Sequence, residues 1–274
     1  MSDRPLPPPR KIAFILASTD HGAMIINRFD YKMQDEVRGF GVGFKLLDES
    51  SYELSEVSIG SFVLASRHRH FGGGVVALDC GANVGTHTVE WARQMTGWGS
   101  VTAIEAQERV YYALAGNVAV NNCFNARVIH AAVGDGNGMM KIPNPDYAAP
   151  ASFGSLQLKH SDKVEDIGQP INHDDAALVP VRLITIDSLA LKRVDLLKID
   201  VEGMESEVLD GARRTIRQCL PVILIEHLKT GADQIAPVLQ RHGYKLAELG
   251  VNILAIHPSD KTLEGFGGAW SGQA

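Results

Sequence analysis

With 274 residues, of which 45% are hydrophobic and 21% charged, the chain has the size and composition of one large α/β domain with an extension, or of two small globular domains. The formal net charge of −6 argues against a duplex nucleic acid as a partner, because phosphate binding needs a concentrated positive face. Three cysteines without a CxxC pair argue against a structural zinc site or a disulfide framework and fit a reducing compartment.

The first part of the chain, residues 1–74, has an irregular pattern and is predicted to be an N-terminal extension. Its apolar run IAFILA is too short to span a bilayer and lacks the form of a signal peptide, so we expect a cytoplasmic protein without a membrane partner. IAFILA and AMIINRF predict short strands, and residues 54–67 predict a helix. The basic run RHRH at residues 67–70 is interpreted as a solvated helix end. The extension is expected to serve as a lid or as the surface of a homodimer.

From residue 75 the pattern becomes regular, and strands alternate with helices. The predicted strands cover 75–80, 100–106, 126–134, 181–187, 195–201 and 221–227. The predicted helices cover 86–96, 107–121, 204–217 and 233–242. A hairpin that turns at Gly250 closes the pattern. This alternation predicts an α/β domain over residues 75–274, with a mostly parallel sheet that is covered on both faces.

One segment, residues 136–180, interrupts this order because it is rich in Pro, Gly, Asp and Ser. An irregular insertion of this length inside a compact domain is usually functional or mobile. Within it, Ser152, Phe153 and Ser155 are candidates for a lid over a substrate, and a mobile surface loop is the alternative.

The turn after the first regular strand, DCGANVG, predicts a nucleotide site, since ligands of such sheets bind beyond the carboxyl ends of the strands. A dinucleotide fingerprint needs G-x-G-x-x-G, whereas Gly81 and Gly85 form only G-x-x-x-G. The carboxylate of Asp79 would repel a pyrophosphate but suits a ligand with an amino group and a sulfonium. Glu105 ends the next strand and can accept both hydroxyls of a ribose. These features favour S-adenosylmethionine (SAM) over NAD as the cofactor.

Two further residues near this turn have two interpretations each. Asp135 follows the third strand and would either accept a hydrogen bond from the adenine amino group or serve as a turn residue. His87 lies in the first turn after the glycine loop and would face either the cofactor or solvent.

Several motifs of the chain resemble those of the FkbM family of SAM-dependent methyltransferases. They are DCGANVGTHT, AIEAQ, AAVGDGNG, LLKIDVEGMESEVLDGA and PVILIEH, and the resemblance runs from Val75 to His257. The most specific is K-I-D-V-E-G-x-E at residues 198–205. The resemblance implies a Rossmann-like class I methyltransferase fold with an antiparallel C-terminal strand. It also implies methyl transfer to a hydroxyl oxygen of a sugar, a polyketide or another small-molecule acceptor.

Carried onto this chain, the resemblance assigns the loop from Gly81 to Thr88 to the cofactor, including Asn83 and Thr86, and assigns Glu105 to the ribose. The chain departs from the family where EAQER lacks the proline that many members have after the acid. The long insertion at 136–180 is a second departure. Both departures bear on the identity of the substrate.

The catalytic candidates end two later strands of the predicted sheet. Asp200, Glu226 and His227 are expected to converge there, since the two strands are neighbours in such a sheet. His227 would act as the general base, or Asp200 and Glu226 would bind Mg²⁺ or another hard cation that acidifies the acceptor hydroxyl. A histidine hydrogen-bonded in the packing is the third possibility. Glu202 is a further catalytic candidate whose alternative is a helix cap.

The sequence therefore predicts a SAM-dependent methyltransferase that acts on an oxygen atom of a small molecule. An NAD-binding α/β oxidoreductase is one alternative, against which the missing third glycine and Asp79 argue. A non-catalytic module that keeps the fold for binding is the other, against which the intact cofactor loop argues.

Overall fold

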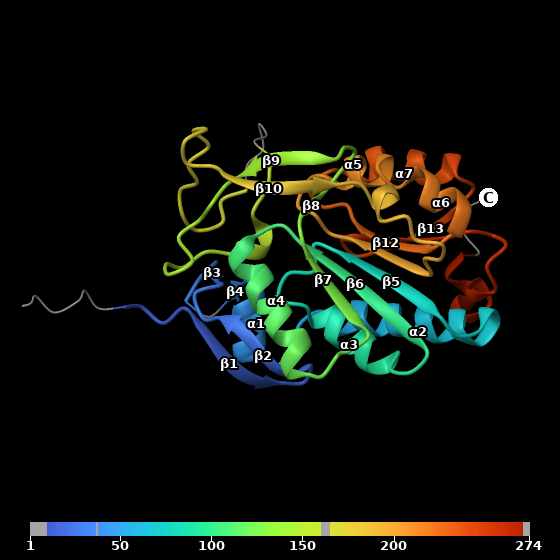
Figure 1. Cartoon of the computed structure of the whole chain (residues 1–274), viewed down its shortest axis with the longest axis horizontal. Coiled ribbons are helices and arrows are strands. Elements are labelled where there is room, and N and C mark those ends of the chain that lie inside the picture. Colours follow the sequence, from blue (N-terminus) through green and yellow to red (C-terminus); the bar gives the residue numbers. More distant parts are fainter. Residues whose placement is uncertain (1–9, 37, 160–164, 271–274) are drawn as a thin grey trace, which may run out of the picture.

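A seven-stranded sheet lies at the centre of the computed structural model, which describes residues 10–36, 38–159 and 165–270 (Figure 1). Across the sheet the strands follow in the order β13 (Lys245–Leu249), β14 (Asn252–Ile256), β12 (Val222–Glu226), β11 (Leu196–Ile199), β5 (Val75–Cys80), β6 (Gly99–Glu105) and β7 (Ala126–His130). β14 alone runs in the direction opposite to the other six strands. The predicted α/β class, with a mostly parallel sheet and an antiparallel C-terminal strand, is confirmed.

Helices cover both faces of this sheet, as the apolar runs of its central strands require. One face is covered by α2 (Leu54–Phe71), α3 (Thr86–Gln94) and α4 (Glu108–Val120) (Figure 1). The other is covered by α5 (Glu205–Asp210), α6 (Arg213–Cys219) and α7 (Ala232–Arg241). None of the helices in the described ranges is long and apolar enough to cross a membrane.

The single helix predicted over 204–217 is in fact two helices, α5 and α6. The carboxylate of Asp187 accepts hydrogen bonds from the backbone N–H groups of Arg214 and Thr215, and so starts a new helix there. Gly211 lies at the break, where a Cβ atom would come 2.0 Å from the carbonyl oxygen of Gly134. The distant Asp187 therefore fixes the break, and the local periodicity does not show it.

The strand predicted over 126–134 also divides. Its first part is β7, and residues near its end form β8 (Ala132–Val133), which leaves the central sheet. A second, three-stranded sheet takes the order β8, β10 (Val179–Ile184), β9 (Gly138–Ile142). Thus the segment predicted as a strand at 181–187 pairs outside the central sheet, and the segment expected to be irregular contains the strand β9.

The N-terminal segment adds a hairpin, a short strand pair and a helix to the domain. These elements are β1 (Phe14–Thr19), β2 (Gly22–Asn27), β3 (Lys32–Met33), β4 (Gly39–Phe40) and α1 (Val42–Asp48). The hairpin β1–β2 packs on α4, where Asn117 bonds both the N–H and the carbonyl of Ile25, and Asn121 bonds both those of Ala23. The side chains of one helix thereby fix the position of the hairpin.

The basic run at 67–70 is only partly solvated, because Arg67 is buried. Its guanidinium lies 3.0 Å from Asp195 and 2.6 Å from Asp260, measured to the nearest carboxylate oxygens. Buried charges are tolerated in proteins when they are paired in this way. The interpretation of this run as a solvated helix end is therefore wrong for Arg67.

Candidate active site

A cavity of about 220 Å³ opens where the carboxyl ends of β5, β6, β11 and β12 meet. Eight of the residues predicted to bind the cofactor, to act in catalysis or to hold a metal line it, namely Gly81, Asn83, Thr86, His87, Glu105, Asp200, Glu202 and Glu226. This is the edge of the sheet at which α/β proteins bind their ligands. The cavity therefore brings the predicted cofactor loop and most of the predicted catalytic carboxylates together.

The glycine loop lies directly on the strand end that carries Asp200. Gly81 has a φ of +79°, and a Cβ atom on it would lie 1.6 Å from the carbonyl oxygen of Asp200. The backbone N–H groups of Gly81 and Ala82 donate to the carbonyl of Ile104 at 2.9 and 3.0 Å. Only glycine permits this contact, so the loop is held between β11 and β6.

Glu105 lines the cavity from the end of β6 and is 6% exposed. Its two carboxylate oxygens accept hydrogen bonds from the backbone N–H groups of Asn83 (2.9 Å) and Gln107 (2.8 Å). Burial raises the pKa of Glu105 to about 7, and these hydrogen bonds oppose the rise. Each carboxylate oxygen can accept a second hydrogen bond, so the group can still bind a pair of hydroxyls.

Three of the predicted cofactor residues, Asp79, Gly85 and Thr88, do not line the cavity. Asp79 is fully buried and accepts a hydrogen bond of 2.6 Å from the hydroxyl of Thr88. Burial raises the pKa of Asp79, and its Oδ1 atom has no hydrogen-bond partner among the described residues. Gly85 packs against Leu114 of α4. In the structure these residues support the junction of β5 and α3.

Asp135 is exposed and does not line the cavity. The chain turns away after β7 to form β8, and Ala131, Ala132 and Val133 line the cavity in its place. Of the two interpretations of Asp135, its position fits that of a turn residue.

Lys198 is a residue of the site to which the sequence analysis gave no role. It lies on β11, is 3% exposed, and its Nζ atom lies 3.0 Å from Oδ2 of Asp200. Burial alone would lower the pKa of Lys198, but four carboxylates together raise it above its usual value. They belong to Asp200, Asp79, Glu53 and Glu56. A signal existed in the sequence, because a lysine within an apolar strand needs a buried partner.

The predicted catalytic carboxylates form a group at the carboxyl ends of β11 and β12. Asp200, Glu202 and Glu226 each offer an oxygen, and these atoms lie within 4.8 Å of one another. Burial and the charge of Asp200 raise the pKa of Glu226 to about 8. Two of the three acids already have a lysine, since Lys198 bonds Asp200 and Lys229 bonds Glu202.

Glu202 itself has a left-handed backbone, with a φ of +58°. Glu202 does not fill the alternative role proposed for it, a helix cap, because the N-cap residue of α5 is Met204, whose side chain makes no capping hydrogen bond. The carboxylate of Glu205 accepts hydrogen bonds from the backbone N–H groups of Val201 (3.2 Å) and Gly203 (3.0 Å). Non-glycine residues in this conformation are concentrated at functional sites, and Glu202 directs its carboxylate into the cavity.

His227 does not join this group. It follows Glu226 directly, and successive side chains of a strand point to opposite faces of the sheet. Glu226 lines the cavity and His227 does not. The backbone N–H of His227 donates to the carbonyl of Val251 at 2.9 Å, and its Nε2 atom has no hydrogen-bond partner in the described part of the chain.

The irregular segment after β9 also reaches the cavity. Ser152 and Ser155 line it, together with Leu156 and Leu158. Phe153 instead is buried beneath this segment, where its ring lies 4.8 Å from that of Tyr147. Two of the three residues predicted for a lid are therefore at the cavity.

Part of the cavity wall comes from the N-terminal segment, where the sequence showed no functional pattern. Tyr52 and Glu53 line the cavity, with Phe40, Val42 and Lys45 nearby. Burial raises the pKa of Glu53 to about 8, with contributions from neighbouring carboxylates. These residues lie next to the glycine loop only because the chain folds back on itself.

Comparisons with known proteins identify the domain that contains this cavity. A family model described as the methyltransferase FkbM domain matches residues 79–246. A search among curated proteins found no match to the chain.

Three solved structures illustrate the likeness in fold. A methyltransferase FkbM from Methylobacillus flagellatus KT is 18% identical, with a TM-score of 0.45 over 68% of this chain and 43% of its own. A precorrin-6y C5,15-methyltransferase from Geobacter metallireducens GS-15 is 15% identical, with a TM-score of 0.43 over 75% and 88%. A magnesium protoporphyrin IX methyltransferase from Synechocystis PCC 6803 is 11% identical, with a TM-score of 0.41 over 80% and 86%. The chain thus spans less than half the length of the first.

Proposed function

The chain belongs to the FkbM methyltransferase family, and we propose that it transfers the methyl group of SAM to a hydroxyl oxygen of a small molecule. One observation supports the proposal independently of the family match. The glycine loop and Asp200 are in backbone contact, so a cofactor on the loop and an acceptor beside Asp200 would share one cavity.

The residues around the cavity fit SAM in their chemistry. Glu105 keeps free acceptor capacity for the ribose hydroxyls, and residues of the glycine loop line the same cavity. The carboxyl groups of Asp200, Glu226 and Glu53 make this end of the cavity acidic, which favours a ligand with a sulfonium and an ammonium group over a pyrophosphate. The NAD-binding alternative has no such support.

In the proposed mechanism SAM supplies an electrophilic methyl group, and the chain supplies orientation and proton removal. Glu105 binds the ribose. The carboxylate of Asp200 accepts the proton of the acceptor hydroxyl, and Lys198 holds that carboxylate in place. Ser152 and Ser155 lie across the cavity and offer hydroxyls to a polar acceptor.

A hard cation such as Mg²⁺ on Asp200 and Glu226 was the other interpretation of these acids. The oxygen set of Asp200, Glu202 and Glu226 has a suitable spacing, but the ammonium groups of Lys198 and Lys229 already bond two of its members. A cation there would have to compete with both lysines. We therefore propose proton removal by Asp200 in preference to metal assistance at this group.

The proposal is tested by binding and by product. Calorimetric titration should show that SAM and its demethylated product bind, whereas NAD does not. Incubation with SAM and a panel of sugars, polyols and polyketide alcohols should then give a product heavier by one methyl group, placed on oxygen by NMR. Absence of SAM binding would refute the proposal. SAM binding with a product methylated on nitrogen would overturn the acceptor class, and binding with no product from any of the panel would favour the non-catalytic module.

A further inference from the structure

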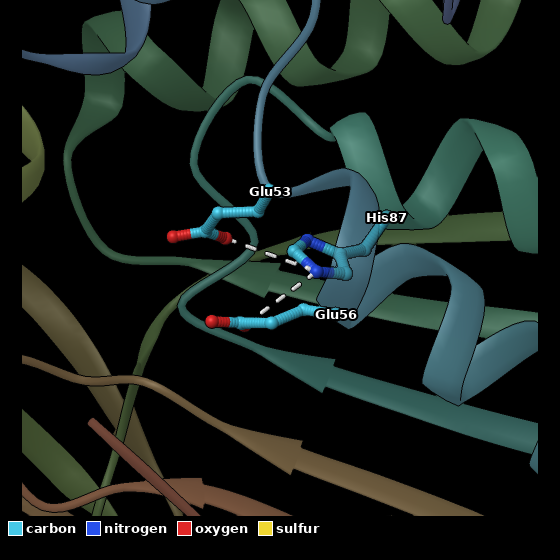
Figure 2. A group of neighbouring side chains, drawn as sticks. All are labelled: Glu53, Glu56 and His87. Atoms are coloured by element: carbon cyan, nitrogen blue, oxygen red, sulfur yellow. Dashed lines mark ion pairs between the residues drawn. The ribbon is translucent and has the colours of Figure 1, made fainter. Parts of the chain in front are cut away.

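A second group of ionisable side chains lies on the cavity wall, away from Asp200 and formed largely by the N-terminal segment. Glu53 directly precedes α2, Glu56 lies in the first turn of α2, and His87 lies in the first turn of α3. Figure 2 shows the imidazole of His87 pointing between the two carboxylates. His87 is more than 30 positions from both glutamates in the sequence, so only the fold brings it to them.

The distances within this group fit a common ligand. The Nε2 atom of His87 lies 3.8 Å from an oxygen of Glu53 and 3.8 Å from an oxygen of Glu56 (Figure 2). All three ligand atoms lie within 4.8 Å of one another. Two atoms that bind one transition metal, each about 2.1 Å from it, lie at most about 4.2 Å apart. The two histidine distances satisfy this limit, and a small side-chain movement brings the carboxylates within it.

His87 supplies an observation that is independent of the acids. Its side chain is 4% exposed, and its Nε2 atom is buried without a hydrogen-bond partner in the described part of the chain. Leaving such an atom unsatisfied costs about 1–3 kcal/mol, so native proteins rarely do so without a reason. Burial, followed by the charge of Lys198, lowers the pKa of His87 well below its usual value. The imidazole is therefore neutral, which is the form that binds metal ions.

Hydrogen bonds orient the two carboxylates and leave oxygen atoms available to an ion. One oxygen of Glu56 accepts a hydrogen bond of 2.6 Å from the side chain of Asn252, and its other oxygen faces His87. The side chain of Tyr52 hydrogen-bonds the carboxylate of Glu53. Glu53 makes no capping hydrogen bond to α2. Outer partners of this kind orient the ligands of metal sites.

We propose that Glu53, Glu56 and His87 form a binding site for a divalent transition-metal ion such as Zn²⁺ or Mn²⁺. Imidazole favours such ions over Mg²⁺ and Ca²⁺, and two carboxylates balance the charge of one ion. Glu53 and His87 line the cavity, so the remaining coordination positions face it.

Lys198 is the cation that could oppose this site. Its charge acts on Glu53 and Glu56, but its hydrogen bond goes to Asp200. Asp79 also acts on Lys198, so that four carboxyl groups face this one ammonium, and a bound ion would take the place of the protons that burial favours on Glu53 and Glu56. The bound ion would link α2 to α3 and fix this part of the cavity wall.

Metal binding to the full-length, tag-free chain tests the site without any measurement of methyl transfer. Calorimetry with Zn²⁺ and with Mn²⁺ should show one equivalent bound in the wild type. Glu53→Gln, Glu56→Gln and His87→Gln should each weaken binding at least about tenfold, since even residues that only orient ligands contribute about 10- to 100-fold. In pulsed EPR of the Mn²⁺ complex, the coupling to an imidazole nitrogen should disappear in His87→Gln.

Glu226→Gln is the matched control, because it removes a carboxylate from the same cavity but from outside the group. It should leave the affinity within about threefold of the wild type. The glutamine variants keep the volume of the side chain, and circular dichroism confirms that each is folded. No binding of either metal, or equal binding by all three variants and the wild type, would overturn the proposal. Loss of binding in Glu226→Gln with retention in Glu53→Gln would place the ion at Asp200 and Glu226 instead.

Discussion

The Nζ atom of Lys198 lies 3.0 Å from Oδ2 of Asp200, two residues further along the chain. Residues i and i+2 of a strand point to the same face, so the K-I-D segment places an acid and its counter-charge side by side. Lys198 is nearly fully buried and faces several carboxylates, whereas Asp200 reaches the cavity. The lysine thus balances the charge of a site that would otherwise consist almost entirely of acids.

Lys198→Met should lower the free energy of unfolding by about 3–5 kcal/mol at pH 8, because it leaves buried carboxylates without their partner. The loss should shrink at pH 6. Carboxyl groups such as Glu53 and Glu226, whose pKa burial raises to about 8, bind protons in the folded state that the unfolded state releases, and this stabilises the fold as the pH falls. Urea unfolding at both pH values measures the effect.

Lys141→Met is the control for that experiment, since Lys141 pairs with Asp175 at the surface. Its loss should stay below about 1 kcal/mol at both pH values. Equal losses for the two variants would show that Lys198 does not compensate the acids.

The affinity for SAM should fall as the pH is lowered from 8 to 6. Burial raises the pKa of Glu105 to about 7, and protonation turns one of its acceptor oxygens into a donor that cannot accept from the ribose. Glu105→Gln should bind SAM more weakly, by about 1.5–3 kcal/mol for each charge-assisted hydrogen bond lost. Calorimetry at pH 6, 7 and 8 measures both effects. Other groups of the cavity also titrate between pH 6 and 8, so the deciding result is the difference between wild type and variant in the slope of log Kd against pH. Identical slopes would exclude the ribose role of Glu105.

Gly81→Ala should abolish SAM binding and destabilise the fold, because the new Cβ would collide with the backbone of Asp200. Gly97→Ala is the control, since Gly97 also has a positive φ (+84°) but nothing within 4 Å of the position of a Cβ. That variant should lose only the about 1–2 kcal/mol of left-handed strain and keep SAM binding. Thermal unfolding and calorimetry compare the two. Similar behaviour of both variants would mean that the contact with Asp200 is not required.

Asp200→Asn should keep most of the affinity for SAM but lose about 10²- to 10⁴-fold in turnover, the usual effect of removing a positioned base. His227→Ala should lose far less, because His227 does not line the cavity. Steady-state rates at saturating acceptor compare them. A large loss in His227→Ala with a small one in Asp200→Asn would restore the interpretation of His227 as the general base.

Arg67→Met should destabilise the chain by about 3–5 kcal/mol, because it leaves Asp260 buried without its arginine and takes from Asp195 one of its two arginines, the other being Arg193. Arg213→Met removes an exposed pair with Asp210 and should cost less than about 1 kcal/mol. Urea unfolding of the two variants tests whether the burial of the pair determines the loss. A small effect at Arg67 would show that this buried pair does not contribute to stability.

The central strands β5, β11 and β12 could be predicted because each is largely apolar, and β5 (Val75–Cys80) matches its predicted bounds. The cofactor loop could be located because Gly81 follows such a strand. The strand β8 could not, since two residues carry no periodicity and its pairing with β10 is set by residues about 50 positions away. For the same reason, the sequence predicts Asp135 at the carboxyl end of a strand of the central sheet.

The part of the site that the sequence did not reveal is tertiary in origin. Glu53 directly precedes α2 and Glu56 lies in its first turn, positions with no functional pattern in the sequence, and only the folded chain brings them to His87. Lys198 differs, because an isolated charge inside an apolar strand can be seen in the sequence. The sequence could therefore have predicted the buried ion pair of Lys198 with Asp200, but not the distant carboxylates of Asp79, Glu53 and Glu56 around it.

Asn117 and Asn121 hold the N-terminal hairpin by its main chain, and this has an evolutionary consequence. Their side-chain amides bond the N–H and carbonyl groups of residues 23 and 25, which every amino acid except proline possesses. Substitutions along the hairpin can therefore accumulate without loss of its anchor, whereas a change at either asparagine removes two bonds at once. Among homologues, we expect the two asparagines to persist while the hairpin that they hold diverges.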